Sequence, residues 1–106
     1  MPQVEASKLQ ISASQLAELR RVLQHYVPHA EVWAYGSRVA GTAHEGSDLD
    51  LVLRNPSDIV RDVEGWAELK EAVQASSLPM LVDIHLWSRL PSAFQAEIER
   101  AYLVIQ

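Results

Sequence analysis

The chain has 106 residues, of which 48% are hydrophobic and 22% are charged. This length and balance predict one globular domain over residues 1–106, since a single domain usually spans about 100–150 residues. Four glycines and no cysteine exclude a collagen-like chain and a disulfide-stabilised scaffold. No hydrophobic run reaches the roughly 18–20 residues that cross a membrane, and the first ten residues lack the pattern of a signal peptide. We therefore expect a cytoplasmic protein with no membrane partner.

The net charge is negative: fourteen acidic against nine basic residues give a formal charge of -5. Proteins that bind long nucleic acids usually carry a basic surface, because phosphates must be neutralised. We therefore expect no direct binding to long DNA or RNA. A single nucleotide stays compatible with this charge, since metal ions and backbone N–H groups can hold its phosphates.

The first predicted element is a helix over residues 12–27, which follows a loose N-terminal end at residues 1–10. Ser12 and Gln15 fit a capping box at its start, and Pro28 ends it. Large apolar residues recur along it at helical spacing and define one hydrophobic face: Leu16, Leu19, Leu23 and Tyr26.

Strands are predicted where aliphatic, β-branched and aromatic residues gather between turn signals, at residues 31–35, 49–53 and 81–87. Between the last two, helical spacing and turn chemistry predict a helix that Asp58 caps and Gly65 interrupts.

A final helix is predicted over residues 92–102, with Phe94 and Ile98 facing inward, and the apolar tail at 103–105 is a candidate edge strand. The order of elements predicts an α/β (α+β) fold, a small mixed β-sheet of at least three strands packed with helices. We expect the three tryptophans to anchor the core or an interface rather than stack on bases, because none lies in a basic stretch.

Gly36 and Ser37 end the first predicted strand. Backbone N–H groups at such a turn, together with a serine hydroxyl, can bind an anion. The same dipeptide is also common in ordinary turns. Arg38 follows directly; its guanidinium can reach a phosphate, or it can pair with Glu45 in the next loop.

Asp48 and Asp50 are separated by one residue, so on a strand their side chains share a face. Two unpaired carboxylates on one strand face repel each other, and a divalent cation removes this cost. Hard oxygen ligands favour Mg²⁺ or Mn²⁺ over zinc. The alternative is a solvated strand face or a helix-cap pair.

Asp83 is a third carboxylate, in the middle of the third predicted strand. It joins Asp48 and Asp50 on one face if its strand pairs beside theirs, and three carboxylates suit two metal ions about 3.5–4 Å apart. Alternatively it is a surface residue on an edge strand. His85 shares the face of Asp83 and either orients a substrate or is structural.

Taken together, Gly36-Ser37, ten residues, Asp48-x-Asp50 and the later Asp83 resemble the DNA polymerase beta-like nucleotidyltransferase superfamily. The string AYGSRVAGTAHEGSDLDLVL is similar to the minimal nucleotidyltransferases of bacteria and archaea. The resemblance implies that the three aspartates bind two Mg²⁺ ions, with Mn²⁺ as an alternative. It also implies that Gly36 and Ser37, with Arg38 beside them, bind the phosphates of a nucleoside triphosphate, ATP in this family.

The same resemblance implies a partner, a helical HEPN-type toxin, with a tyrosine of that toxin as the acceptor of AMP and this chain as the antitoxin. Two other functions stay open from the sequence. One is a non-enzymatic binding subunit that neutralises its partner by contact. The other is a nucleotidyltransferase that modifies a small molecule.

Overall fold

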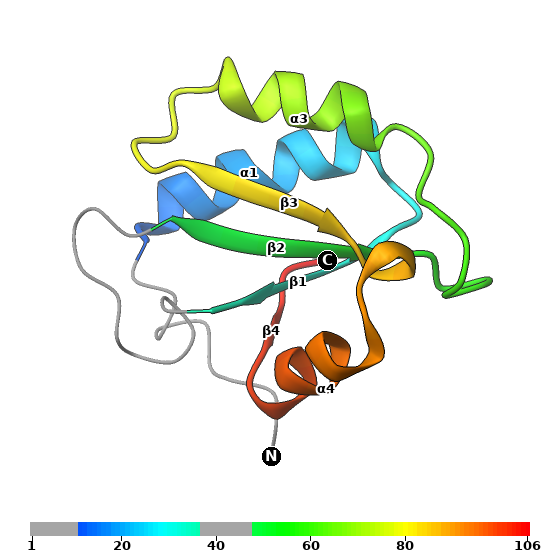
Figure 1. Ribbon diagram of the computed structural model, residues 1–106. Helices are drawn as coiled ribbons and strands as arrows, with labels where there is room; N and C mark the ends of the chain where they lie inside the picture. The colour runs from blue at the N-terminus through cyan, green and yellow to red at the C-terminus, as the bar shows by residue number, and fades with distance from the viewer. Residues whose placement is uncertain (1–10, 37–47) are drawn as a thin grey trace.

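The structure is a computed structural model that describes residues 11–36 and 48–106. Its centre is a four-stranded sheet with helices on both faces (Figure 1). In chain order the elements are α1 (Ala13–Tyr26), β1 (Glu31–Tyr35), β2 (Leu49–Arg54), α3 (Trp66–Gln74), β3 (Val82–Leu86), the 3₁₀ turn η2 (Trp87–Arg89), α4 (Ser92–Arg100) and β4 (Leu103–Val104).

The sheet is mixed, with the strand order β3-β2-β1-β4. β1 runs antiparallel to both β2 and β4, whereas β2 and β3 are parallel neighbours. The apolar tail therefore does add an edge strand, and the expected α+β class is confirmed. The predicted loose end at residues 1–10 lies outside the described residues, and the single domain over 1–106 stays a prediction.

The first helix begins as its sequence indicates. Ser12 accepts a hydrogen bond from the Gln15 backbone N–H, and the Gln15 side chain accepts one from the Ser12 backbone N–H, which completes the capping box. Leu19 and Leu23 on its inner face are fully buried. Of the helices in residues 11–36 and 48–106, none is long and apolar enough to cross a membrane.

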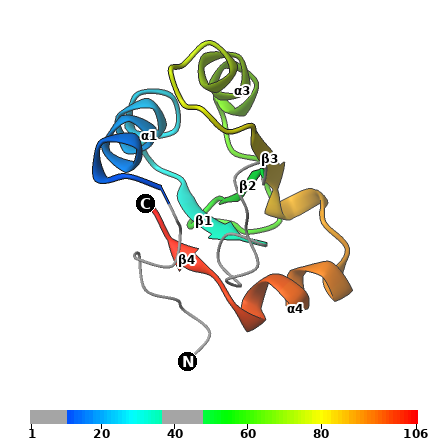
Figure 2. The ribbon, with the colours of Figure 1, turned by 90° about the vertical axis from the view of Figure 1, so that its left-hand side faces the viewer.

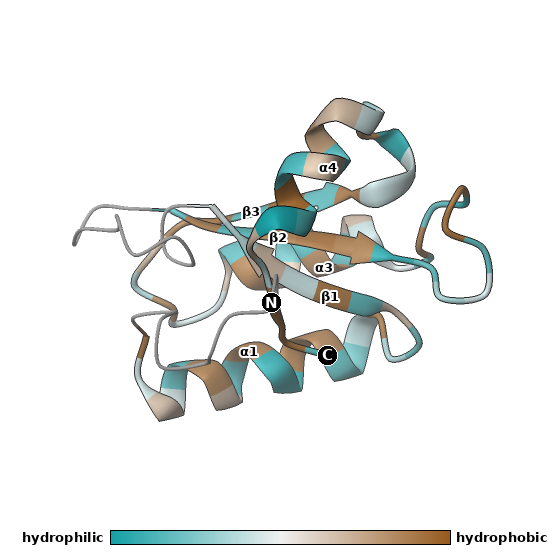
Figure 3. Cartoon of the chain, turned by 90° about the horizontal axis from the view of Figure 1, so that it is seen from below, coloured by the Kyte–Doolittle hydropathy of each residue, from teal (hydrophilic) through white to brown (hydrophobic). Residues whose placement is uncertain are grey.

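Figure 2 shows helices on opposite faces of the sheet, and a hydrophobic cluster lies on each face. On one face, Leu49, Leu51 and Leu53 of β2 pack against α1 and α3. The other face is covered by α4 and carries the smaller cluster, which contains Trp33, Tyr35, Val52, Trp87 and Ile98. Figure 3 shows the largely hydrophobic β2 between these helices. Successive residues of a strand thus point alternately into one layer and the other.

The helix predicted after Asp58 begins later than expected, at Trp66. Asp58 instead accepts a hydrogen bond from the Val60 N–H within a turn, and Ile59 is 44% exposed. Gly65 precedes the helix with a φ of 88°, a left-handed conformation that a helix interior excludes. The apolar spacing before Gly65 therefore reflected local turns rather than a helix.

Two further boundaries differ from the prediction. The third strand ends at Leu86, because Trp87 starts η2. The last helix ends at Arg100, and Phe94, expected to face the core, is 44% exposed, whereas Ile98 is buried.

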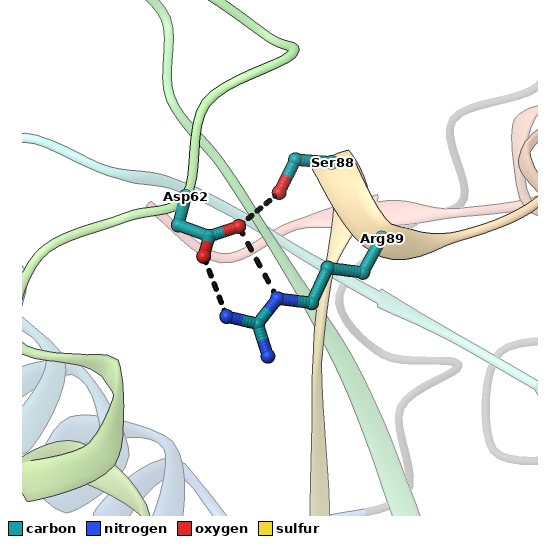
Figure 4. A network of polar contacts seen from close by, with 3 residues as sticks. All are labelled: Asp62, Ser88 and Arg89. Carbon is teal, nitrogen blue, oxygen red and sulfur yellow. Dashed lines mark hydrogen bonds and ion pairs between the residues drawn. The ribbon is translucent and has the colours of Figure 1, made fainter.

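A polar network joins the segment before α3 to the end of β3 (Figure 4). Asp62 accepts hydrogen bonds from the Arg89 guanidinium at 2.6 Å and from the Ser88 hydroxyl at 2.6 Å. These hydrogen bonds hold the pKa of the Asp62 carboxyl below its usual range. They attach residues near 62 to η2 beside the sheet.

Replacing Gly65 by alanine should destabilise the fold. A Cβ at this position would overlap the backbone carbonyl oxygen of Tyr26, and φ is positive. We expect the free energy of unfolding to fall by about 1–3 kcal/mol. Urea denaturation of Gly65→Ala against the neighbouring Glu64→Ala, an exposed site, measures this. Equal midpoints for the two variants would contradict the assigned conformation.

Candidate functional site

A row of three side chains crosses the sheet on the face covered by α4. In the register of the strands, Asp50 of β2 lies opposite Tyr35 of β1 on one side and opposite Asp83 of β3 on the other. Directly paired residues point to the same face of a sheet. Since Leu49 and Leu51 are buried in the α1/α3 layer, the row of Tyr35, Asp50 and Asp83, called the acid row below, faces α4.

Burial and neighbouring carboxylates disfavour the negatively charged forms of Asp50 and Tyr35 in the acid row. Burial raises the pKa of the Asp50 carboxyl, and the nearby Asp83 and Asp48 raise it further, while His85 opposes them. Burial also raises the pKa of the Tyr35 hydroxyl, with Asp50 and Asp83 as additional causes. The acid row therefore favours a bound cation.

One aromatic side chain and one imidazole lie beside this row. His85 Nε2 lies 3.8 Å from Asp83 Oδ2, and the imidazole centroid is 6.4 Å from that of Tyr35. On the other side, Phe94 of α4 meets Tyr35 edge to face with centroids 6.0 Å apart. Sequence reasoning treated Tyr35 only as a strand former; its position directly before Gly36, in a strand paired with β2, is the signal that places it here.

Gly36 is fitted closely against Asp50. It has a φ of 84°, and a Cβ added there would overlap the Oδ2 atom of Asp50. Any other residue would displace the Asp50 carboxylate or strain the backbone. The first part of the Gly-Ser motif is therefore in contact with the second aspartate. Ser37 and Arg38 lie outside the described residues.

The carboxylate oxygens of Asp48, Asp50 and Asp83 are suitable ligands for a hard divalent cation. Asp50 and Asp83 are in register on adjacent strands, and the exposed Asp48 directly precedes β2, from where it raises the pKa of Asp50. Carboxylate oxygens are the ligands that Mg²⁺ and Mn²⁺ prefer. Within residues 11–36 and 48–106, however, no three acidic, histidine or cysteine side chains lie close enough to enclose an ion. The structure thus brings Asp50 and Asp83 together and leaves Asp48 at the rim.

A cavity of about 520 Å³ opens between α4 and two residues of the acid row, Tyr35 and Asp50. Tyr35, Gly36, Asp50 and His85 line it from the sheet. Its helical wall includes Phe94 and a surface ion pair of Glu97 with Arg100 at 3.4 Å. A second cavity of similar volume lies at the other end of β1 and β2, and its lining includes Asp62, which forms an ion pair with Arg89. Of these two cavities, the first reaches the acid row.

The sequence itself matches a known domain. A nucleotidyltransferase domain matches residues 16–105 of the sequence. This range includes the whole acid row. The chain belongs to the nucleotidyltransferase domain family. The chain is an enzyme of the nucleotidyltransferase class.

A curated relative confirms the resemblance to the minimal nucleotidyltransferases, and a solved structure shares the fold. A protein of Haemophilus influenzae named "Probable protein adenylyltransferase MntA" is 41% identical over 103 residues, which cover 94% of this chain and 86% of that protein. A solved structure described as "Crystal structure of the toxin-antitoxin with AMP-PNP" superposes with a TM-score of 0.68 over 86% of this chain and 72% of that one. At 18% identity, the second match shows a shared fold.

Asp50→Asn should stabilise the metal-free nucleotidyltransferase at neutral pH. Because the folded pKa of Asp50 is raised, the folded state binds its proton more tightly than the unfolded state, and stability is lost as pH rises through that pKa. Removing the charge should raise the free energy of unfolding by up to about 1 kcal/mol at pH 7, as for other cross-strand like-charge pairs.

The gain in the free energy of unfolding of Asp50→Asn should vanish near pH 3. Carboxyl groups are mostly protonated there, since the usual aspartate pKa is about 3.9. Urea denaturation in chelator at both pH values measures it, with Glu99→Gln on the exposed side of α4 as the matched loss of charge. A gain of the same size at both pH values would contradict the electrostatic cause.

Proposed function

We propose that this nucleotidyltransferase transfers AMP from ATP to a tyrosine hydroxyl of a helical HEPN-type toxin, and that it acts in the cytoplasm as the antitoxin of that pair. The pairing of Asp83 with Asp50, which lines an open cavity, carries the proposal. The relative named as a protein adenylyltransferase supports a protein acceptor. The fold shared with a toxin–antitoxin structure supports the kind of partner.

The proposed binding groups follow from their positions. Asp48, Asp50 and Asp83 would hold two Mg²⁺ ions, or Mn²⁺ in their place. When bound, such ions neutralise phosphate charge and lower the pKa of an acceptor hydroxyl. Gly36 lets the turn after β1 pack closely against the Asp50 carboxylate, which a side chain at this position would displace. Ser37 and Arg38 would hold the terminal phosphates of the nucleotide.

The reaction is a displacement at the α-phosphorus of ATP. The acceptor oxygen forms a bond to that phosphorus, the bond from phosphorus to the bridging oxygen of the β-phosphate breaks, and pyrophosphate leaves. The proton of the acceptor hydroxyl passes to the Asp83 carboxylate and then to water. The Asp83 side chain is 61% exposed, so an acceptor from another molecule can reach it. Positioning and charge neutralisation provide most of the catalysis.

The decisive experiment incubates the purified chain with Mg²⁺, ATP and the toxin encoded beside it. Label at the α-phosphate should appear on the toxin, whereas label at the γ-phosphate should leave with pyrophosphate. Asp50→Asn should slow transfer on the order of 10²–10³-fold, comparable with the loss of one oxyanion-hole donor. The toxin should still co-purify with the variant, because asparagine preserves the volume of the side chain.

Asp58→Asn is the matched control, since Asp58 lies in a turn beyond the opposite end of β2 and its replacement keeps a hydrogen-bond acceptor for Val60. Mass spectrometry of the labelled toxin identifies the acceptor atom. Wild-type protein that binds the toxin without transferring label would favour the binding-subunit function. Equal transfer by Asp50→Asn and wild type would remove Asp50 from the site.

A further inference from the structure

Phe94 is placed unusually for a large aromatic residue on a short amphipathic helix. It lies near the start of α4 and remains 44% exposed, although Ile98 one turn later is buried and attaches the helix to the sheet. Packing of α4 therefore leaves nearly half of the phenylalanine open to solvent. Its ring contacts Tyr35 edge to face and lines the cavity at the acid row.

Other exposed apolar residues do not share this setting. Val60 and Leu81 are 77% and 75% exposed, yet neither lines the cavity at the acid row. Phe94 touches the Tyr35 ring, Tyr35 pairs with Asp50 across the strands, and Phe94 and Asp50 line the same cavity. A ligand held at the acid row by its phosphates would thus have an open aromatic surface within the same cavity.

We propose that Phe94 stacks against the nucleobase of the donor nucleoside triphosphate. This inference rests on the proposed function, because the acid row must hold the triphosphate. A volume of about 520 Å³ lies within the usual size of small-ligand sites, roughly 300–1,000 Å³. Aromatic side chains stack on any base, since every base has a π face. Phe94 therefore contributes affinity for bases in general and does not choose among them.

The polar groups of α4 that line the cavity favour a nucleobase over the ring of a tyrosine acceptor. Beside Phe94, Glu97 and Arg100 place a carboxylate and a guanidinium on the cavity. A nucleobase carries ring nitrogens and amino or carbonyl groups that can bond to both. A tyrosine acceptor carries one hydroxyl, and that group must reach the acid row. The base is therefore the better occupant of this wall.

The test compares two ligands that differ in the nucleoside. Isothermal titration calorimetry would measure binding of a non-hydrolysable ATP analogue and of tripolyphosphate, both with Mg²⁺, to the full chain. For Phe94→Ala we expect the dissociation constant of the analogue to rise on the order of 10-fold, the range typical of a lost base stack. Tripolyphosphate binding should not change. Phe94→Tyr should restore analogue binding.

Tyr26→Ala is the matched control, because Tyr26 is 36% exposed and lines the cavity at the other end of the sheet. It should bind both ligands as wild type does. Three results would overturn the inference while leaving the proposed function intact: equal affinity of wild type for both ligands, weakening of both ligands by Phe94→Ala, or loss of transfer to the toxin with normal analogue binding. Wild-type protein that binds neither ligand would overturn the proposed function and the inference together.

Discussion

The site depends on the parallel pairing of β2 with β3, which places two carboxylates side by side. Like charges in direct register cost roughly 0.2–1 kcal/mol on a sheet. The same strands bury Leu49, Leu51 and Ile84 on their opposite face, and each buried aliphatic side chain contributes about 1.5–3 kcal/mol. Burial on one face therefore exceeds repulsion on the other, and strand pairing places Asp50 beside Asp83.

The α4 face is divided between a closed end and an open end. At the closed end the Arg54 guanidinium lies 4.2 Å from the Trp33 ring centroid and 4.7 Å from that of Trp87, and it pairs with Glu31 at 3.2 Å. Trp33 also stacks on Tyr102 at 4.0 Å. These contacts confirm that Trp33 and Trp87 are core anchors. At the open end α4 leaves a cavity over acidic groups, so one sheet face provides both the anchor and the site.

Much of the fold could be predicted because its patterns are local. The capping box of α1 and the strand formers of β1 and β2 lie within single elements, and the structure places these elements within one or two residues of expectation. The late start of α3 depends on Gly65 meeting the carbonyl of Tyr26, a contact between distant residues. The helical period likewise places Phe94 on a face but does not show what covers that face. Asp48 and Asp50 follow from spacing, whereas the neighbours of Asp50 follow from strand register, which the sequence does not specify.

The contact between Gly36 and Asp50 explains why the two halves of the motif form one unit. Tyr35 and Asp50 are the last pair of the β1–β2 register, so the chain leaves β1 directly beside the Asp50 carboxylate. A residue with a side chain would occupy that space. The register therefore fixes Gly36 and Asp50 relative to each other. Strand pairing thus places the backbone of Gly36 and the carboxylate of Asp50 side by side at the candidate site. A divalent cation that bound these carboxylates in the folded state alone would offset the repulsion within the acid row and stabilise the fold.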